Sequence, residues 1–142
     1  MKILVVIEHD NKNIKQSSFS TITAANEIDS NVEAIILGKD LEKTLDSLKK
    51  SNGLKKIYAV DSEIFENPIA ENLSLTISKF IEGKSFTHIL SPSSTFGKNM
   101  SPKLSALLDV QQISDITKVI NKETFERPIY AGNAIAKVKS NE

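Results

Sequence analysis

Four short apolar runs, separated by segments with helical periodicity, constrain the fold of this chain most strongly. The runs span residues 2–7, 32–37, 56–60 and 87–90, and β-branched side chains are frequent in them. Such runs are typical of strands that are buried on both sides in a parallel sheet. Because a helical pattern follows each run and crossovers are right-handed, we predict an α/β fold: a Rossmann-like doubly wound parallel sheet with helices on both faces.

Signals for helix ends support this order. We expect the hydroxyls of Ser17 and Ser18 to cap the first helix. The third helix should begin at residues 67–68, because a proline at the first helical position loses no hydrogen bond. A short fourth helix is expected over residues 100–108.

The pattern changes from Gln111 onward, where short extended pieces replace the alternation of strands and helices. These pieces lie at residues 113–120, 129–130 and 135–138, and Gly132-Asn133 is a weak hairpin signal because Asn usually precedes Gly in such turns. We therefore predict a single domain over residues 1–142, with its core in residues 1–110 and short extended segments over 111–138.

Composition excludes several functions. The 18 Lys and Arg residues balance 18 Asp and Glu residues, and Arg127 is the single arginine, so neither nucleic acid nor an anionic membrane is an expected partner. Without cysteine, disulfides and thiolate sites are impossible, and His9 and His88 have no metal-ligand spacing. No apolar run reaches the length of a membrane span, and the first residues already form a strand. We expect a cytoplasmic protein, or a mature mitochondrial-matrix form whose presequence is absent.

Two loops follow predicted strands at the edge where open α/β sheets bind ligands. The first contains Glu8, His9 and Asp10. It can be interpreted as an acid/base cluster of a hydrolase using His9 and Asp10, or as a solvated loop. No nucleophile accompanies it, which favours the solvated loop.

The second loop spans residues 91–99 and offers a candidate anion site in Ser94, Thr95, Gly97, Lys98 and Asn99. Small hydroxyl residues, a glycine, a lysine and a helix N-terminus are the components of a phosphate cradle. The loop lacks the glycine spacing of a P-loop. Two interpretations stay open: a nucleotide site for AMP or ATP, or polar side chains that satisfy only the backbone of the loop.

Four further side chains have structural explanations. His88 lies inside a predicted strand and should bond to the backbone. Arg127, between Glu126 and Pro128, is expected to form an ion pair or to contact a partner, and Tyr58 and Tyr130 should pack in the core. The residues alone therefore build no catalytic site and no metal site.

The chain nevertheless resembles the alpha subunits of electron transfer flavoproteins over nearly its whole length. Four strings in the right order carry the resemblance: ILVVIEHDNKNIKQSSFSTITAA, THILSPSSTFGKN, LLDVQQISDI and RPIYAGNAIAKV. The resemblance implies an N-terminal domain with the fold of adenine nucleotide alpha-hydrolases. In the family's beta subunit the similar domain holds AMP, whereas the site in the alpha subunit is taken to be empty.

The resemblance also implies partners. The family forms a heterodimer of alpha and beta subunits with one FAD, accepts electrons from acyl-CoA and other flavin dehydrogenases in fatty acid beta-oxidation, and passes them to a membrane quinone oxidoreductase of the respiratory chain. Its FAD pocket lies in a C-terminal alpha domain that these residues lack. The resemblance therefore implies a scaffold and docking domain that is not an enzyme and binds no FAD by itself.

Overall fold

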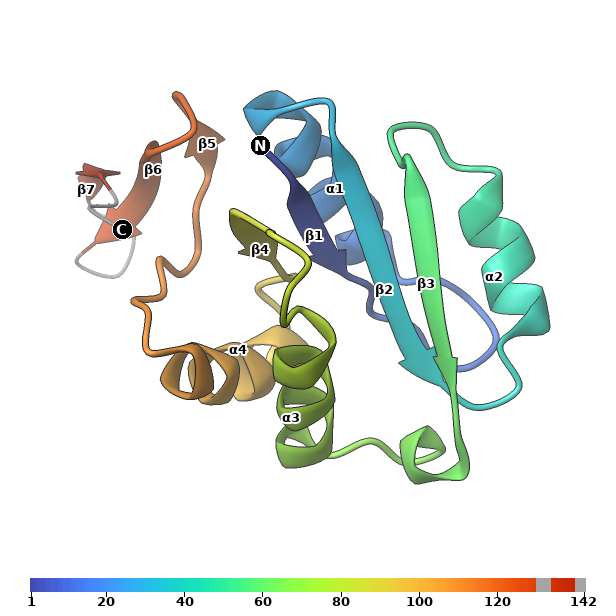
Figure 1. Cartoon of the computed structure of the whole chain (residues 1–142). Helices are drawn as coiled ribbons and strands as arrows, with labels where there is room; N and C mark the ends of the chain where they lie inside the picture. Colours follow the sequence, from blue (N-terminus) through green and yellow to red (C-terminus); the bar gives the residue numbers. More distant parts are fainter. Residues whose placement is uncertain (130–133, 140–142) are drawn as a thin grey trace.

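A parallel sheet of four strands forms the centre of the molecule, for which the computed structural model describes residues 1–129 and 134–139 (Figure 1). The strands are β1 (Ile3–Val6), β2 (Val32–Gly38), β3 (Lys56–Asp61) and β4 (His88–Leu90). They lie in the order β3-β2-β1-β4, with Ile3 opposite both Val32 and His88. This sheet confirms the predicted fold class.

Helices cover both faces of the sheet. They are α1 (Gln16–Ile28), α2 (Glu42–Lys49), α3 (Ala70–Phe80) and α4 (Thr95–Leu108), with a 3-10 turn, η1 (Glu63–Phe65), before α3. The buried clusters show that α1 and α2 lie on one face, and α3 and α4 on the other. This arrangement follows from right-handed crossovers on either side of β1.

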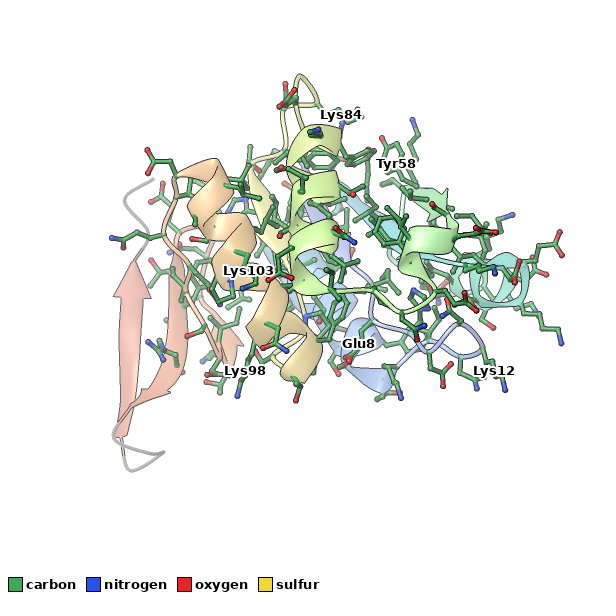
Figure 2. The ribbon with its side chains drawn as sticks, turned by 90° about the horizontal axis from the view of Figure 1, so that it is seen from below. Glu8, Lys12, Tyr58, Lys84, Lys98 and Lys103 are labelled. Carbon is green, nitrogen blue, oxygen red and sulfur yellow. The ribbon has the colours of Figure 1, made fainter. Side chains whose placement is uncertain are left out.

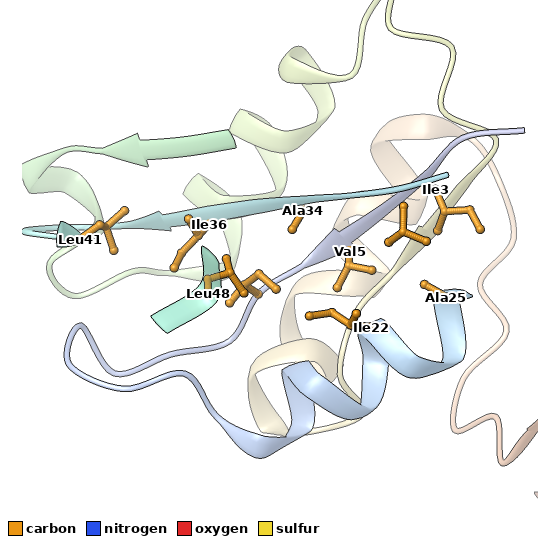
Figure 3. Packing of buried hydrophobic residues seen from close by; sticks show 10 residues of the cluster. Ile3, Val5, Ile22, Ala25, Ala34, Ile36, Leu41 and Leu48 are labelled. Carbon is orange, nitrogen blue, oxygen red and sulfur yellow. The ribbon is translucent and has the colours of Figure 1, made fainter. Parts of the chain in front are cut away.

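The side chains of β1 and β2 alternate between two buried clusters. The cluster beneath α1 and α2 (Figure 3) includes Ile3, Val5, Ile22, Ala34, Ile36 and Leu48. The cluster beneath α3 and α4 includes Leu4, Val6, Ile35, Leu73, Ile77 and Met100. Each fully buried aliphatic side chain contributes about 1.5–3 kcal/mol relative to exposure, so the apolar runs of the central strands hold the fold together.

The start of α1 differs from the prediction. Its N-cap is Lys15, which makes no side-chain cap bond. Ser17 instead donates to a carboxylate oxygen of Glu8 at 2.7 Å, and the hydroxyl of Ser18 bonds to both the backbone N–H and the carbonyl of Glu8. The predicted caps were wrong because these hydroxyls tie the helix to the end of β1.

Two other helix starts also differ. Helix α3 begins at Ala70, after Ile69, so residues 67–68 precede the helix and do not cap it. Helix α4 begins at Thr95, before the predicted residue 100, and contains Pro102. Ser94 is its N-cap and accepts a hydrogen bond from the backbone N–H of Gly97, which starts the helix earlier than its apolar stripe indicates.

The last part of the chain forms a separate antiparallel sheet. It consists of β5 (Lys118–Val119), β6 (Thr124–Ile129) and β7 (Ala134–Lys139), in that order. The expected extended pieces are thus confirmed at residues 118–119, 129 and 135–138, whereas Ile120 lies just after β5. Ile113 and Ile116 lie in a segment without strand pairing, and Tyr130 and the expected turn at Gly132-Asn133 fall outside the described residues.

Candidate functional site: a pocket beside the edge strand

A pocket of about 600 Å³ lies at the point where the helices change sides of the sheet. Strands β1 and β4 are neighbours, but α1 after β1 and α4 after β4 cover opposite faces (Figure 1). Such switch points are where open α/β sheets bind ligands. The walls come from α1, the end of β4, α4 and residues 110–116.

The loop between β4 and α4 forms one side of this pocket. Ser94, Gly97 and Lys98 of the candidate anion site line it. A smaller pocket lies between the starts of α3 and α4, and Asn99 lines that one. Thr95 lines neither of these two pockets. The structure therefore brings three of the five predicted residues together.

Charge at the pocket comes from a single pair. The Nζ atom of Lys98 lies 3.8 Å from a carboxylate oxygen of Asp115, and both side chains are substantially exposed. Figure 2 shows Lys98 and Lys103 on α4; Lys103 pairs instead with Glu71 of α3 at 3.4 Å. Sequence reasoning missed Asp115, because nothing in its local pattern indicates that residues 110–116 fold back over α4.

The wall from α1 was also missed. Ser17, Ser20, Thr21 and Ala24 face the pocket. Thr21 donates its hydroxyl to the carbonyl of Ser17 at 2.8 Å, and Ser20 donates to Gln16 at 3.4 Å. The clustering of small polar residues along one side of this predicted helix is the signal that could have indicated a second wall.

The loop after β1 is held by its own hydrogen bonds. His9 accepts from the backbone N–H of Asn11 at Nδ1, 3.0 Å away, so the imidazole in its neutral form donates from Nε2 to the carbonyl of Leu37 at 2.7 Å. Gly38 leaves room for this ring, because a β-carbon there would lie 2.5 Å from Cε1 of His9. Both ring nitrogens are engaged with backbone, which favours the structural interpretation of His9.

Asp10 stabilises the turn that follows. Its carboxylate accepts from the backbone N–H groups of Asn13 at 2.6 Å and of Lys12 at 2.9 Å. These two bonds lower the pKa of Asp10 below its ordinary value, the bond from Asn13 most. A carboxylate that is held ionised in this way is a poor proton acceptor at neutral pH.

His88 connects the two sheets. Its Nε2 lies 2.7 Å from the carbonyl of Lys122 in the turn between β5 and β6, and its Nδ1 lies 2.9 Å from the hydroxyl of Thr87. A carbonyl can only accept, so Nε2 carries the proton. The predicted backbone bond of His88 is confirmed, and it reaches across to the antiparallel sheet.

Arg127 has an unpaired polar atom. Its Nε is buried without a hydrogen-bond partner, and the ion pairs found among the described residues do not include Arg127. The ion-pair interpretation is therefore not supported within the described part of the chain, and contact with a partner stays a prediction.

Tyr58 takes part in a polar contact that the sequence did not indicate. It packs edge-to-face on Phe80 at 4.7 Å between ring centroids, as expected for a core residue, and donates its hydroxyl to Glu33 at 2.8 Å. The pKa of Tyr58 is raised, first by burial and then by its bond to Glu33. The ammonium nitrogen of Lys84 lies over the ring of Phe80, 4.5 Å from its centroid.

Groups of His, Asp and Glu that could hold a metal ion are absent from the part of the chain that the structure describes. Within the same residues, none of the helices has the length and apolar character needed to cross a bilayer. The pocket beside β4, with a neutral rim and hydroxyl-rich walls, is therefore the candidate site.

Comparison with known proteins identifies the family. The model of the electron transfer flavoprotein domain matches residues 3–142. The mitochondrial electron transfer flavoprotein subunit alpha of Dictyostelium discoideum is 44% identical over 98% of this chain, and the subunit alpha of Pseudomonas aeruginosa is 38% identical over 99%. The matches cover 41% and 45% of those proteins, so this chain spans less than half of their length. The chain belongs to the electron transfer flavoprotein family, and its relatives are alpha subunits.

Proposed function

We propose that this chain is the N-terminal scaffold and docking domain of an electron transfer flavoprotein alpha subunit, a single domain over residues 1–142 with its core in residues 1–110. The observation that carries the proposal is the match to alpha subunits over 98–99% of the chain. The partner is an electron transfer flavoprotein beta subunit. We expect the chain to have no catalytic role of its own, and the engagement of both histidines with backbone groups supports this expectation.

The FAD of the family is held by groups outside these residues. The larger pocket has a single positive side chain, Lys98, already paired with Asp115, so it offers little to a flavin pyrophosphate. The assembled flavoprotein would carry electrons from acyl-CoA and other flavin dehydrogenases, through a quinone oxidoreductase, to the respiratory chain. We expect it to act in the mitochondrial matrix or in the cytoplasm of a bacterium; the names of the Dictyostelium and Caenorhabditis elegans relatives call those proteins mitochondrial.

Co-expression with a tagged beta subunit tests the docking role. We expect the two chains to elute as a stable complex, and this chain purified alone to lack visible flavin absorbance. This chain passed over the same resin without the tagged beta subunit is the control for nonspecific retention. Two well-folded chains that never co-elute would disprove docking, and a yellow preparation of this chain alone would disprove the location of the flavin.

The presence of the pocket supports a second candidate function, the binding of a small molecule by residues 93–99. Its volume of about 600 Å³ falls within the range of ligand sites. Calorimetric titration with AMP, ATP and FAD tests a nucleotide site, and loss of binding in Lys98→Ala would place the ligand at this loop. Absence of heat with all three ligands would remove a phosphorylated nucleotide as the occupant.

A further inference from the structure

We infer that the pocket between α1 and α4 takes an uncharged, flat ligand of nucleoside size that bears hydroxyl or amino donors, and that it discriminates against the phosphorylated form. The inference rests on the small-molecule site proposed above and defines the chemistry of its ligand. Three properties of the walls carry it: their charge, the start of α4, and the direction of their hydroxyl groups.

The charge of the walls is balanced. Among the described residues that line the pocket, Lys98 and Asp115 are the charged ones, and their side chains lie 3.8 Å apart. A phosphate placed near Lys98 would also lie near the carboxylate of Asp115. Attraction and repulsion of similar size then cancel, whereas an uncharged ligand is unaffected.

The start of α4 is less open to an anion than a free helix N-terminus, which binds phosphate through unpaired backbone N–H groups. The hydroxyl of Ser94 accepts from the N–H of Gly97, which is one of these groups. The bond from the N–H of Lys98 to the carbonyl of Ser94 is the ordinary first bond of the helix. The carbonyl oxygen of Pro92 occupies the space beside Gly97 in which a β-carbon would lie. Its partial negative charge opposes an anion at this position.

Hydroxyl groups of the walls leave acceptors for a ligand. Ser17 donates to Glu8, Thr21 donates to Ser17, and Ser105 donates to the carbonyl of Val110. Each hydroxyl has one proton and two lone pairs, so these groups keep acceptor capacity and favour a ligand that donates. The apolar remainder of the wall suits the face of a heterocycle; it includes Ile89, Leu90, Leu104, Leu108, Ile113 and Ile116.

Calorimetric titration of the whole chain with adenosine, AMP and inorganic phosphate tests the inference. We expect adenosine to bind at least about tenfold more tightly than AMP, a difference of about 1.4 kcal/mol or more in binding free energy. Inorganic phosphate should not bind. In Asp115→Asn, the affinity for AMP should rise about threefold to tenfold, because a half-exposed negative charge that repels the phosphate has been removed. The affinity for adenosine should change by less than about twofold. Asn also tolerates the positive φ of 56° at this position.

A matched pair of variants on α1 locates the ligand. Ser20→Trp places a large side chain at the pocket wall and should abolish adenosine binding. Thr23→Trp, on an exposed position of the same helix outside the wall, should leave binding unchanged.

Each alternative outcome is decisive. Tighter binding of AMP or of phosphate would overturn the neutral ligand but keep a small-molecule site. Binding of adenosine that survives Ser20→Trp would overturn the location. Failure of all three titrations would remove the pocket as a site for this class of ligand, without bearing on docking to a beta subunit.

Discussion

The carbonyl oxygen of Pro92 occupies the place where a β-carbon on Gly97 would lie. Gly97 is buried in the first turn of α4, and its N–H donates to the hydroxyl of Ser94. The contact lets the loop after β4 fold tightly back on the helix that it starts. The shape of the pocket wall therefore depends on a residue without a side chain.

Gly97→Ala should destabilise the chain by about 1–3 kcal/mol, the usual cost of forcing extra volume into a packed site. The obstacle is a backbone atom, so the loop itself must shift. Urea unfolding followed by circular dichroism measures the change. Lys98→Ala, at the next and exposed position, is the control and should cost less than about 1 kcal/mol. Equal stability of Gly97→Ala and the parent chain would contradict the close contact.

Gly38→Ala should disturb the loop after β1 through His9. The added β-carbon would lie 2.5 Å from Cε1 of His9 and 2.7 Å from side-chain atoms of Asn11 and Leu41. If His9 is the main obstacle, removing its ring relieves the strain, and Gly38→Ala should cost less in a His9→Ala background. A double-mutant cycle should then give a coupling of about 0.5–3 kcal/mol. Strictly additive effects would show that Asn11 and Leu41, and not the ring of His9, are the main obstacles to the added carbon.

Tyr58→Phe should remove an alkaline transition. The pKa of Tyr58 is raised in the folded chain above its ordinary value of 10.0. The stability that the protonated hydroxyl contributes is therefore fully present below pH 10.0, and it is lost as pH rises through the folded-state pKa. The parent chain should therefore lose more stability than Tyr58→Phe above pH 10. At neutral pH the free energy of unfolding of the variant should be lower by about 1–3 kcal/mol, because the buried carboxylate of Glu33 loses a hydrogen-bond donor. Parallel pH profiles of the two proteins would contradict this assignment.

His88→Ala should loosen the antiparallel sheet selectively. Loss of the bond to Lys122 should cost about 0.5–1.5 kcal/mol and speed hydrogen exchange in β5 and β6, while β1 and β2 stay protected. His88→Gln retains an N–H donor and should restore part of the protection. Faster exchange throughout the molecule would show instead that His88 supports the whole fold.

The prediction of the sheet rested on local pattern. The runs around Val5 and Ile35 are apolar at consecutive positions, which only a strand covered on both faces accommodates, and the structure buries both residues completely. The helix starts were harder to predict. A serine can satisfy a helix end or any other nearby polar group; Ser17 bonds to the carboxylate of Glu8, and Ser18 bonds to the backbone of Glu8.

The candidate site was only partly predictable. The loop with Ser94, Gly97 and Lys98 could be selected because it follows a strand, but Asp115 and the serines of α1 could not. The same holds for His9, whose partner is the carbonyl of Leu37, and for Tyr58, whose partner Glu33 belongs to the neighbouring strand. The amino-acid sequence alone determined the fold class and the family. Both depend on patterns among residues that are close along the chain: periodicity, turn residues and the strings shared with known alpha subunits. Charge balance, ring orientation and pocket chemistry depend on groups that meet across large sequence separations, so only the tertiary structure could decide them.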